Sequence, residues 1–174
     1  MLEHKILINE ETLNKRIEEL ANQISEDYKG EEIVLVCTLK GAVYFTIDLS
    51  KKITKNEVIL DFVRVSSYGI NNRETTGKLN FKLDISEDIQ NKNVIIIEDI
   101  IDSGITLNYL YDYLKTKNPK SLKICVLLNK KERRQKEIAL DYVGFEIENK
   151  FVLGYGLDYD EKYRNLPYIG YVEE

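Results

Sequence analysis

The sequence predicts an α/β protein with a doubly wound, mainly parallel sheet flanked by helices. Short apolar runs alternate with amphipathic helical patterns from residue 13 to about residue 128, which is the pattern of repeated strand, helix and strand units. Two of the apolar runs are followed by a short loop containing glycine and then by a helical pattern. Because right-handed crossovers bring the loops after parallel strands to one edge of a sheet, we expect these loops to meet.

The predicted elements follow one another in a regular order. A helix with apolar residues at helical spacing runs from residue 13 to residue 28 and ends at Gly30. Helical patterns also cover residues 43–49 and 107–117, the second ended by Asn118 and Pro119. The strands are predicted at residues 33–38, 58–66, 94–97, 122–128, 142–147 and 151–155, with a half-exposed strand at residues 79–83.

Length and charge narrow the class of protein. The chain has 174 residues, which suits a single domain over residues 1–174 with a substantial core. Its net charge is −5, and the densest basic cluster, at residues 130–136, is short and interleaved with acidic residues. No apolar run approaches the length of a membrane span, and the first residues lack the apolar core of a signal peptide. We therefore expect a cytoplasmic protein with no nucleic-acid and no membrane partner.

The cysteines and the single histidine exclude some kinds of chemistry. Cys37 and Cys125 each lie in an apolar run, where a free cysteine most often behaves as a small buried hydrophobe. Neither has a histidine or a second cysteine at metal-binding spacing, so we interpret both as structural. His4 lies in the N-terminal tail, and the body of the chain therefore offers no histidine for a catalytic triad.

A long polar loop follows the third predicted strand. Residues 66–78 are rich in Gly, Asn, Ser and Thr, and a loop of this length in a compact domain is usually functional or disordered. Tyr68 provides a large side chain that could cover a bound ligand. We expect a hairpin with a mobile tip.

The stretch from Val94 to Leu107 carries the strongest signal for a site. Four β-branched residues are followed by Glu98, Asp99 and then Asp102, and next by small hydroxyl and glycine residues that suit a tight turn. Gly104 lets the backbone approach a ligand, and the N–H groups at a helix N-terminus bind anions. Carboxylates would repel a phosphate unless they bind a divalent cation or sugar hydroxyls. The stretch therefore predicts a site for a ligand that carries phosphate, sugar and Mg²⁺.

A simpler interpretation is that Glu98 and Asp99 only end a strand and that Asp102 caps a helix. Two lysines favour a site instead. Lys40 and Lys130 each follow an apolar strand, and ligands in open α/β sheets bind at the carboxyl ends of the strands. The convergence of separate loops on one edge is stronger evidence than any single residue.

Four motifs in order resemble those of a known family. The segment I-I-I-E-D-I-I-D-S-G-I-T-L resembles the phosphoribosyl-pyrophosphate loop of type I phosphoribosyltransferases. L-K-G at residues 39–41, S-S-Y-G at residues 66–69 and the segment from Asp141 to Gly170 resemble the branch of that family that uses 6-oxopurines. The resemblance covers nearly the whole chain. It implies a small hood formed by the N- and C-terminal segments, a lid at about residues 66–78 and a purine-recognition region at about residues 130–170.

The resemblance also implies the reaction. The 5-phosphoribosyl group of phosphoribosyl pyrophosphate would be transferred to a 6-oxopurine, hypoxanthine or guanine, giving IMP or GMP and pyrophosphate. Asp102 would be the general base at purine N7. The 5′-phosphate would be bound by Asp102, Ser103, Gly104, Ile105 and Thr106, while Glu98 and Asp99 would lie near the ribose and Mg²⁺, and Asp158 would help to bind a Mg²⁺ on the pyrophosphate.

The remaining roles implied by the resemblance concern pyrophosphate, the purine and the lid. Lys40, Gly41 and Arg164 would bind pyrophosphate, and the family has a cis peptide bond at the position of Leu39 and Lys40. The purine would be bound by Lys130 at O6, by stacking on Phe151, by backbone groups of Val152 and by Asp158, and Ser67 and Tyr68 would belong to the lid.

The roles of single residues have simpler structural alternatives. Phe151 could belong to the core of an alternating strand, and Arg164 could simply pair with the acidic turn that contains Asp158.

The chain departs from the family pattern in three places. The departures are Asn129, where many relatives have an acidic residue, and Lys131 and Glu148, where proline is common. Because all three adjoin the purine pocket, they bear on base preference and not on the type of reaction.

Three other functions compete with this one. A regulator on the same fold would bind a phosphoribosylated ligand and nucleic acid, but it should carry a basic face that is not visible here. A receiver or phosphohydrolase domain would use its strand-end acids in phosphoryl transfer. An adenine or orotate transferase would share only the ribosyl-phosphate half of the site. For the assembly, we expect a homodimer or homotetramer, since tyrosine-rich surfaces suit an interface.

Overall fold

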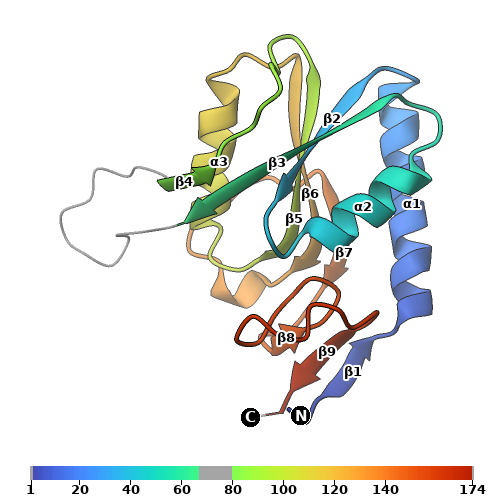
Figure 1. The fold of residues 1–174 in the computed structure, drawn as a ribbon, viewed down its shortest axis with the longest axis vertical. Coiled ribbons are helices and arrows are strands. Elements are labelled where there is room, and N and C mark those ends of the chain that lie inside the picture. Colours follow the sequence, from blue (N-terminus) through green and yellow to red (C-terminus); the bar gives the residue numbers. More distant parts are fainter. Residues whose placement is uncertain (1, 67–79, 174) are drawn as a thin grey trace, which may run out of the picture.

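The computed structural model describes residues 2–66 and 80–173 (Figure 1). In chain order the elements are β1 (Lys5–Ile8), α1 (Glu10–Tyr28), β2 (Ile33–Thr38), α2 (Val43–Lys52), β3 (Val58–Ser66), β4 (Asn80–Leu83), β5 (Asn93–Ile101), α3 (Ile105–Lys115), β6 (Ser121–Asn129), the short 3-10 helix η1 (Lys131–Arg133), β7 (Tyr142–Glu146), β8 (Phe151–Leu153) and β9 (Ile169–Val172). Among these residues no helix combines the length and the apolar composition needed to cross a membrane.

A six-stranded sheet forms the centre of the molecule. Its strand order is β4-β3-β2-β5-β6-β7, and all neighbouring pairs are parallel except β3 and β4, which pair as an antiparallel hairpin. The predicted fold class is therefore confirmed. The predicted strand at residues 79–83 is also confirmed as the return strand of the hairpin, with Val65 opposite Phe81.

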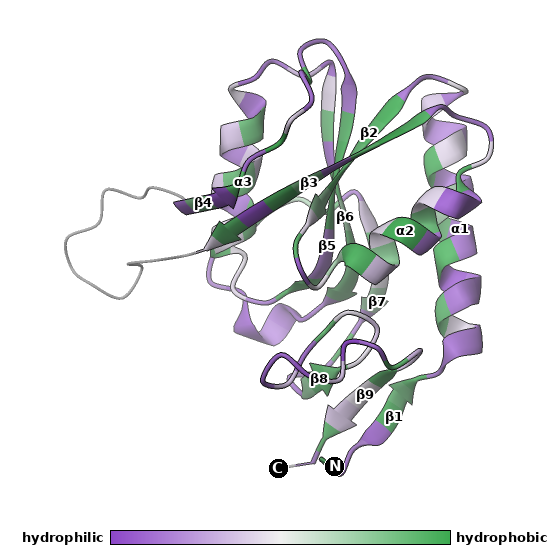
Figure 2. Cartoon of the chain, in the orientation of Figure 1, coloured by the Kyte–Doolittle hydropathy of each residue, from purple (hydrophilic) through white to green (hydrophobic). Residues whose placement is uncertain are grey.

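Helices cover both faces of this sheet. Leu35 and Ile95 pack toward α1 and α2 on one face, whereas Val34 and Val94 pack toward α3 on the other. Since successive side chains of a strand point to opposite faces, strands buried on both sides must be apolar throughout. Figure 2 shows this in the mainly hydrophobic central strands, beside a helix α1 on which hydrophobic and hydrophilic residues alternate.

The order in which successive strands are added to the sheet reverses between β2 and β5. The chain leaves β2 toward α2 and β3 on one side, and it leaves β5 toward α3 and β6 on the other. Pairing of β2 with β5 stops at Cys37 and Ile97, while β5 continues along β6 to Ile101. A crevice at the carboxyl ends of the strands, at such a switch point, is where open α/β sheets bind ligands.

Strand β5 is longer than the sequence predicted. We expected it to end at Ile97, before the acidic pair, but it ends at Ile101. The reason is that β6 continues to offer backbone partners after β2 has turned away, with Ile100 opposite Leu128. Glu98 and Asp99 therefore lie on a strand and not in a loop.

Backbone conformation explains the other shifted boundaries. Helix α1 ends at Tyr28 because Lys29, before the predicted Gly30, already adopts a left-handed conformation. Helix α3 begins at Ile105, two positions before the prediction, directly after the left-handed Gly104. Strand β8 stops short of the predicted Tyr155 because Gly154 and Tyr155 both have positive φ angles.

A second, smaller sheet lies beyond the carboxyl edge of the main sheet. Its order is β1-β9-β8, all antiparallel, and it brings the two ends of the chain together, with Lys5 opposite Tyr171 (Figure 1). This sheet is the expected hood formed by the terminal segments. The individual strands β1 and β9 were not predicted, because each has four residues and its partner lies at the other end of the chain.

Both cysteines are free and fully buried, as the sequence suggested. Burial raises the pKa of the Cys37 thiol to about 11 and also raises the pKa of the Cys125 thiol, because the thiolate is poorly solvated in the core. Neither thiol therefore provides a nucleophile near neutral pH.

A buried carboxylate fixes the base of the hairpin. Asp61 on β3 is 5% exposed, and its Oδ2 accepts hydrogen bonds from the backbone N–H groups of Ser86 and Glu87, both at 2.8 Å. Its Oδ1 accepts from the Ser86 hydroxyl at 3.2 Å and from its own neighbour Phe62 at 2.8 Å. A carboxylate that accepts several N–H groups replaces the water lost on burial.

Asp61→Asn should destabilise the fold by about 1–3 kcal/mol, because the new NH₂ group would face N–H donors that now share a carboxylate oxygen. Chemical denaturation measures the difference. Asp88→Asn is the matched control, since Asp88 is exposed and accepts one local N–H, from Gln90 at 3.0 Å. It should change stability by less than about 0.5 kcal/mol, and equal effects of the two variants would contradict the role given to Asp61.

Candidate functional site

The loop between β5 and α3 has the form of an anion site. Gly104 precedes the first residue of α3 with φ 77°, and it has no side chain to cap the helix. The N–H of Ile105 donates to the Ser103 hydroxyl at 3.3 Å, and the next N–H groups of the first turn, together with the helix dipole, favour an anion at this end. A pocket of about 150 Å³ lies at this loop, lined by Glu98, Ile100, Ile101, Asp102, Ser103, Gly104, Thr106 and Leu107.

The segment after β6 lies against this loop and holds it. The backbone N–H groups of Gln135 and Lys136 both donate to the carbonyl of Ser103 at 3.0 Å, and the N–H of Lys130 donates to the carbonyl of Ile101 at 3.1 Å. A Cβ at Gly104 would lie 2.5 Å from the carbonyl of Lys136, so the close approach also requires glycine. The anion loop is therefore fixed from two sides.

The predicted acid pair lies on the part of β5 that β2 leaves uncovered. Glu98 Oε1 lies 2.8 Å from the hydroxyl of Thr38 on β2 and accepts the N–H of Asp99 at 3.3 Å. Desolvation raises the pKa of Glu98 well above its usual value, and the neighbouring charge of Asp99 raises it further. Glu98 therefore holds a proton more readily than an exposed glutamate, and a bound cation would favour release of that proton.

The loop after β2 contains the expected cis peptide bond between Leu39 and Lys40. The next residue, Gly41, is tightly enclosed. A Cβ at Gly41 would lie 1.7 Å from Oδ2 of Asp99, and a Cβ at Gly156, which has φ 99°, would lie 2.0 Å from the carbonyl of Gly41. Strand β5, the loop after β2 and the hood therefore meet at Gly41.

The two charged side chains predicted to bind pyrophosphate form ion pairs with acidic residues of the hood. Lys40 Nζ lies 2.7 Å from Glu161 Oε2, and Arg164 Nη2 lies 2.8 Å from Asp158 Oδ1 and 3.4 Å from Glu161 Oε2. Arg164 Nη1 also donates to the carbonyl of Gly156 at 2.7 Å. Hydrogen bonding and attraction to Lys40 lower the pKa of Glu161. Phosphate oxygens bound here would compete with these carboxylates for the same donors.

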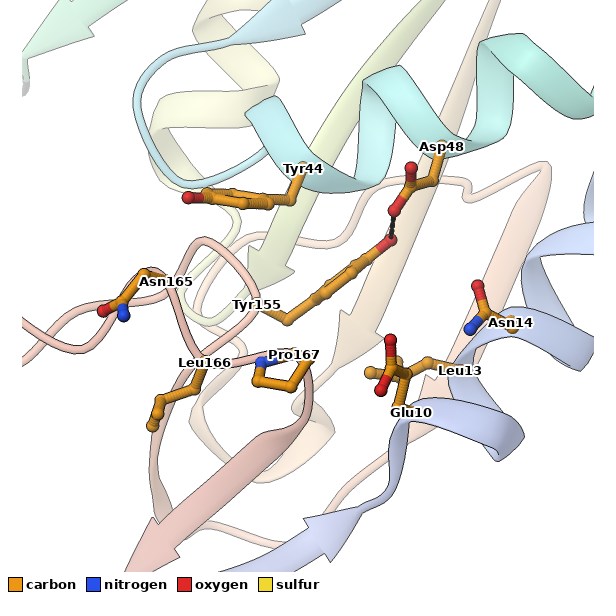
Figure 3. Close-up of a pocket in the computed structure, with 9 residues that line it drawn as sticks. All are labelled: Glu10, Leu13, Asn14, Tyr44, Asp48, Tyr155, Asn165, Leu166 and Pro167. Atoms are coloured by element: carbon orange, nitrogen blue, oxygen red, sulfur yellow. Dashed lines mark hydrogen bonds between the residues drawn. The ribbon is translucent and has the colours of Figure 1, made fainter.

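A hydrogen bond joins the segment after β8, in the hood, to helix α2 (Figure 3). The Tyr155 hydroxyl donates to Asp48 Oδ2 at 2.7 Å, and burial raises the pKa of Tyr155, so the phenol keeps its proton. Tyr44 of α2 packs near the same ring, with centroids 6.1 Å apart. A cavity of about 170 Å³ lies on this side, lined by Glu10, Leu13, Asn14, Tyr44, Asp48, Tyr155, Asn165, Leu166 and Pro167, and it contains none of the predicted site residues (Figure 3).

Two side chains in the site have buried polar atoms without a partner in the described part of the chain. They are Oδ1 of Asp102 and Nε of Arg164. Asp102 Oδ2 lies 3.5 Å from Arg133 Nη1. Because buried polar groups are nearly always hydrogen-bonded, atoms of this kind indicate where a ligand would complete the site.

The residues predicted for the purine lie on β6 and on the hood. Lys130 follows β6 and is 6% exposed, and its ammonium forms no hydrogen bond or ion pair within residues 2–66 and 80–173. Phe151 is 46% exposed and contacts Tyr159 edge to face, with centroids 5.5 Å apart. Phe151 also lines a hollow of about 440 Å³ together with β9 residues, and none of the other predicted site residues lies there.

The structure thus gathers most of the predicted site. The anion loop, the acid pair, the loop around Gly41 and the turn with Asp158 and Arg164 meet at one end of the main sheet under the hood. Ser67 and Tyr68 lie outside the described residues. Thr38, Gly156 and Glu161 were missed, because their importance arises from contacts with distant segments and no local motif marks them.

Oxygen donors are present for a divalent cation, although they do not form a closed site. Among the described residues, no group of three or more Asp, Glu, His or Cys side chains converges at metal-binding distance. Mg²⁺ is commonly held by one or two carboxylates together with substrate phosphates. Glu98, Asp99 and Asp158 fit an arrangement in which the phosphates supply the remaining ligands, because their carboxylates are hard oxygen ligands beside an anion site.

A switch-point crevice with a helix N-terminus, carboxylates near the strand end and cationic loops defines a site for a phosphorylated, nucleotide-type ligand. The class of protein that this site and the matching family model define is the phosphoribosyltransferases. The phosphoribosyl transferase domain family matches residues 6–160. Hypoxanthine phosphoribosyltransferase of Buchnera aphidicola is 47% identical over 97% of this chain and 95% of its own length, and hypoxanthine-guanine phosphoribosyltransferase of Aquifex aeolicus is 44% identical over 98% and 95%.

Solved structures agree with these sequence relatives. A hypoxanthine-guanine phosphoribosyltransferase from Bacillus anthracis, with HEPES in its active site, has a TM-score of 0.92 and 50% identity over 98% of this chain and all of that one. The Trypanosoma cruzi hypoxanthine phosphoribosyltransferase in complex with IMP has a TM-score of 0.90 and 42% identity over 97% and 94%. The chain belongs to the type I phosphoribosyltransferase family, in its hypoxanthine (hypoxanthine-guanine) branch.

Gly41→Ala should weaken binding of Mg²⁺-pyrophosphate roughly 10-fold to 100-fold, because the new methyl group would displace either the loop or Asp99. Isothermal titration calorimetry measures the loss, and the thermal midpoint checks the fold. Lys40→Ala serves for comparison, since it removes a charge and adds no atom. Unchanged affinity in folded Gly41→Ala would show that the contact with Asp99 does not set the loop.

Proposed function

We propose that the protein is a purine salvage enzyme that transfers the 5-phosphoribosyl group from phosphoribosyl pyrophosphate to a 6-oxopurine, giving IMP or GMP and pyrophosphate. The single observation that carries the site assignment is the buried, unpartnered Oδ1 of Asp102 at the entrance to the anion loop. A carboxylate that has one oxygen without a partner among the described residues, two residues before the helix N-cap Gly104, can accept a proton from a purine whose sugar phosphate that helix binds.

Asp102 acts as the general base in this proposal. The C1′–N9 bond forms as the bond from C1′ to pyrophosphate breaks, and the purine loses its N7 proton to the Asp102 carboxylate. Backbone N–H groups and hydroxyls from Asp102 to Thr106, including Ser103, Gly104 and Ile105, hold the 5′-phosphate. The base and the phosphate cradle then move as one unit, because they share a loop.

The acid pair binds the ribose and tolerates the charge that develops on it. Glu98 and Asp99 would accept hydrogen bonds from the C2′ and C3′ hydroxyls, and their negative charge favours a positively charged sugar in the transition state. They and Asp158 would also hold Mg²⁺, which when bound neutralises charge on the pyrophosphate. A bound cation would offset the repulsion between these two neighbouring carboxylates.

Pyrophosphate and the purine are bound on two sides of the site, and Asp158 serves both. Lys40, the N–H of Gly41 and Arg164 bind pyrophosphate, with the orphaned Nε of Arg164 as one available donor. On the other side Lys130 donates to purine O6, Phe151 stacks on the ring and backbone groups of Val152, together with Asp158, meet its edge. A 6-amino group would direct its own hydrogens at the ammonium of Lys130, so 6-oxopurines are preferred.

The proposal extends to the surroundings of the site. Ser67 and Tyr68 would belong to a lid that excludes water while C1′ is electron-poor. The enzyme would work in the cytoplasm as a homodimer or homotetramer, which light scattering at several concentrations would distinguish from a monomer. The single-domain organisation over residues 1–174 is part of the same proposal.

Purified protein with Mg²⁺ and phosphoribosyl pyrophosphate should convert hypoxanthine and guanine to nucleotides, followed by ultraviolet absorbance and chromatography. Adenine and orotate should give no product, and EDTA should abolish the reaction because the pyrophosphate would lose its counter-ion. The absence of IMP and GMP under these conditions would refute the proposed function. Product from adenine would instead place the chain in another branch.

Asp102→Asn should lower kcat by about 10²-fold to 10⁴-fold with little change in the KM of either substrate, since the amide keeps the shape but cannot take the proton. Steady-state kinetics at saturating substrate measures the effect. Turnover equal to that of the unmodified enzyme would remove Asp102 from the role of base.

Lys130→Met should raise the KM for hypoxanthine about tenfold or more, because a charge-assisted hydrogen bond to O6 is lost while the buried stem is replaced. The control is Lys115→Met, an exposed lysine in the last turn of α3. Equal kinetic constants for the two variants would show that Lys130 does not meet the base.

A further inference from the structure

Arg134 links the anion loop to the end of strand β6. Its Nε donates to the carbonyl of Asp102 at 3.1 Å, and its Nη2 donates to Oδ1 of Asn129 at 2.6 Å. Asn129 is the last residue of β6 and precedes Lys130, so one guanidinium connects the residue that carries the proposed base with the neighbour of the proposed O6 donor.

Asn129 itself is held by a matched pair of hydrogen bonds. It is 3% exposed, and while its oxygen accepts from Arg134, its Nδ2 donates to Oε1 of Glu146 at 3.0 Å. The second oxygen of Glu146 pairs with Lys131 at 2.9 Å. An aspartate at position 129 could accept from Arg134 but would direct a carboxylate at Glu146, so the amide suits this particular neighbour.

The purine explains why such a link would matter. O6 and N7 lie on the same edge of a rigid fused ring, so their separation is fixed. Lys130 must donate to the first atom while Asp102 takes the proton from the second. An error in the distance between these two side chains cannot be absorbed by the ring, and misplacement by about 1 Å can cost two orders of magnitude in rate.

We propose that Arg134 is a positioning residue that sets the separation between the Asp102 carboxylate and the Lys130 ammonium, and that Asn129 and Glu146 hold its guanidinium in place. The inference rests on the proposed roles of Asp102 and Lys130. Arg134 also packs against the phosphate cradle, since a Cβ at Gly104 would lie 3.0 Å from its Cδ. The cradle keeps a support of its own, because the backbone N–H groups of Gln135 and Lys136 hold the carbonyl of Ser103.

A double-mutant cycle tests this coupling. Arg134→Ala should lower kcat/KM for hypoxanthine by about 10-fold to 100-fold, with the KM for phosphoribosyl pyrophosphate changed less than about twofold. In a Lys130→Ala background the same substitution should have an effect at least about five times smaller, because the separation no longer matters once one of the two groups is gone. Lys115→Ala is the control, since it removes one charge from an exposed lysine in the last turn of α3, away from both groups.

A second cycle tests the support for Arg134 and does not need the Arg134 variant to fold. Asn129→Asp should reduce kcat/KM for hypoxanthine about tenfold, because two carboxylates would then face each other. Adding Glu146→Gln should restore most of the loss, since the amide introduced on β7 could donate to the new carboxylate and still accept from Lys131. Glu146→Gln alone should also impair the enzyme.

The outcomes separate this inference from the proposed function. Unmodified protein that forms no IMP would refute the function itself. Active unmodified protein combined with full additivity in the first cycle, or with no rescue in the second, would overturn the positioning role. An equal rise in the KM for both substrates would do the same, because it would indicate general loosening of the site.

Discussion

The site depends on one close contact, that of Gly41 with the carboxylate of Asp99. The loop after β2 can reach the end of β5 only because position 41 has no side chain, and the hood in turn rests on the carbonyl of Gly41 through Gly156. Three segments that are far apart in the sequence are therefore packed at van der Waals distance around one residue. Since protein interiors transmit small displacements with little compression, the spacing of the pyrophosphate side, the ribose side and the hood is set together.

Charge compensation follows the same geometry. On β5, desolvation and the neighbouring charge of Asp99 raise the pKa of Glu98 and so the cost of ionising it. On the opposite side, Lys40 and Arg164 are balanced by Glu161 and Asp158, which lie on the hood. A ligand that carries both a cation and phosphates could satisfy both sides in one binding event, while either ion alone would leave one side uncompensated.

Much of this arrangement could be predicted from the sequence, where a local pattern encodes it. The buried apolar runs and their alternation with helices indicated the parallel sheet, and the stretch from Glu98 to Thr106 indicated the anion loop. The strand β5 was predicted too short, because charged residues usually end a strand and only pairing with β6 reveals that this one continues.

Residues whose role comes from long-range packing could not be found in this way. In the basic cluster at residues 130–136, no periodicity shows that Arg134 connects the Asp102 carbonyl with Asn129, whereas the neighbouring Arg133 meets only the Asp102 carboxylate. Asn129 attracted notice only as a departure from the family pattern. The role of its amide depends on a hydrogen bond to Glu146, which lies on the neighbouring strand β7.

The pairing of β1 with β9 has a consequence for the order of folding. Strand β1 is synthesised long before its partner β9, and β8 reaches its place only beside β9. Such long-range pairing is slow, because a large loop must close before any contact is gained. The sheet with its anion loop can thus assemble during synthesis, whereas the hood is completed last, and a nascent chain would bind phosphate before it could bind a purine.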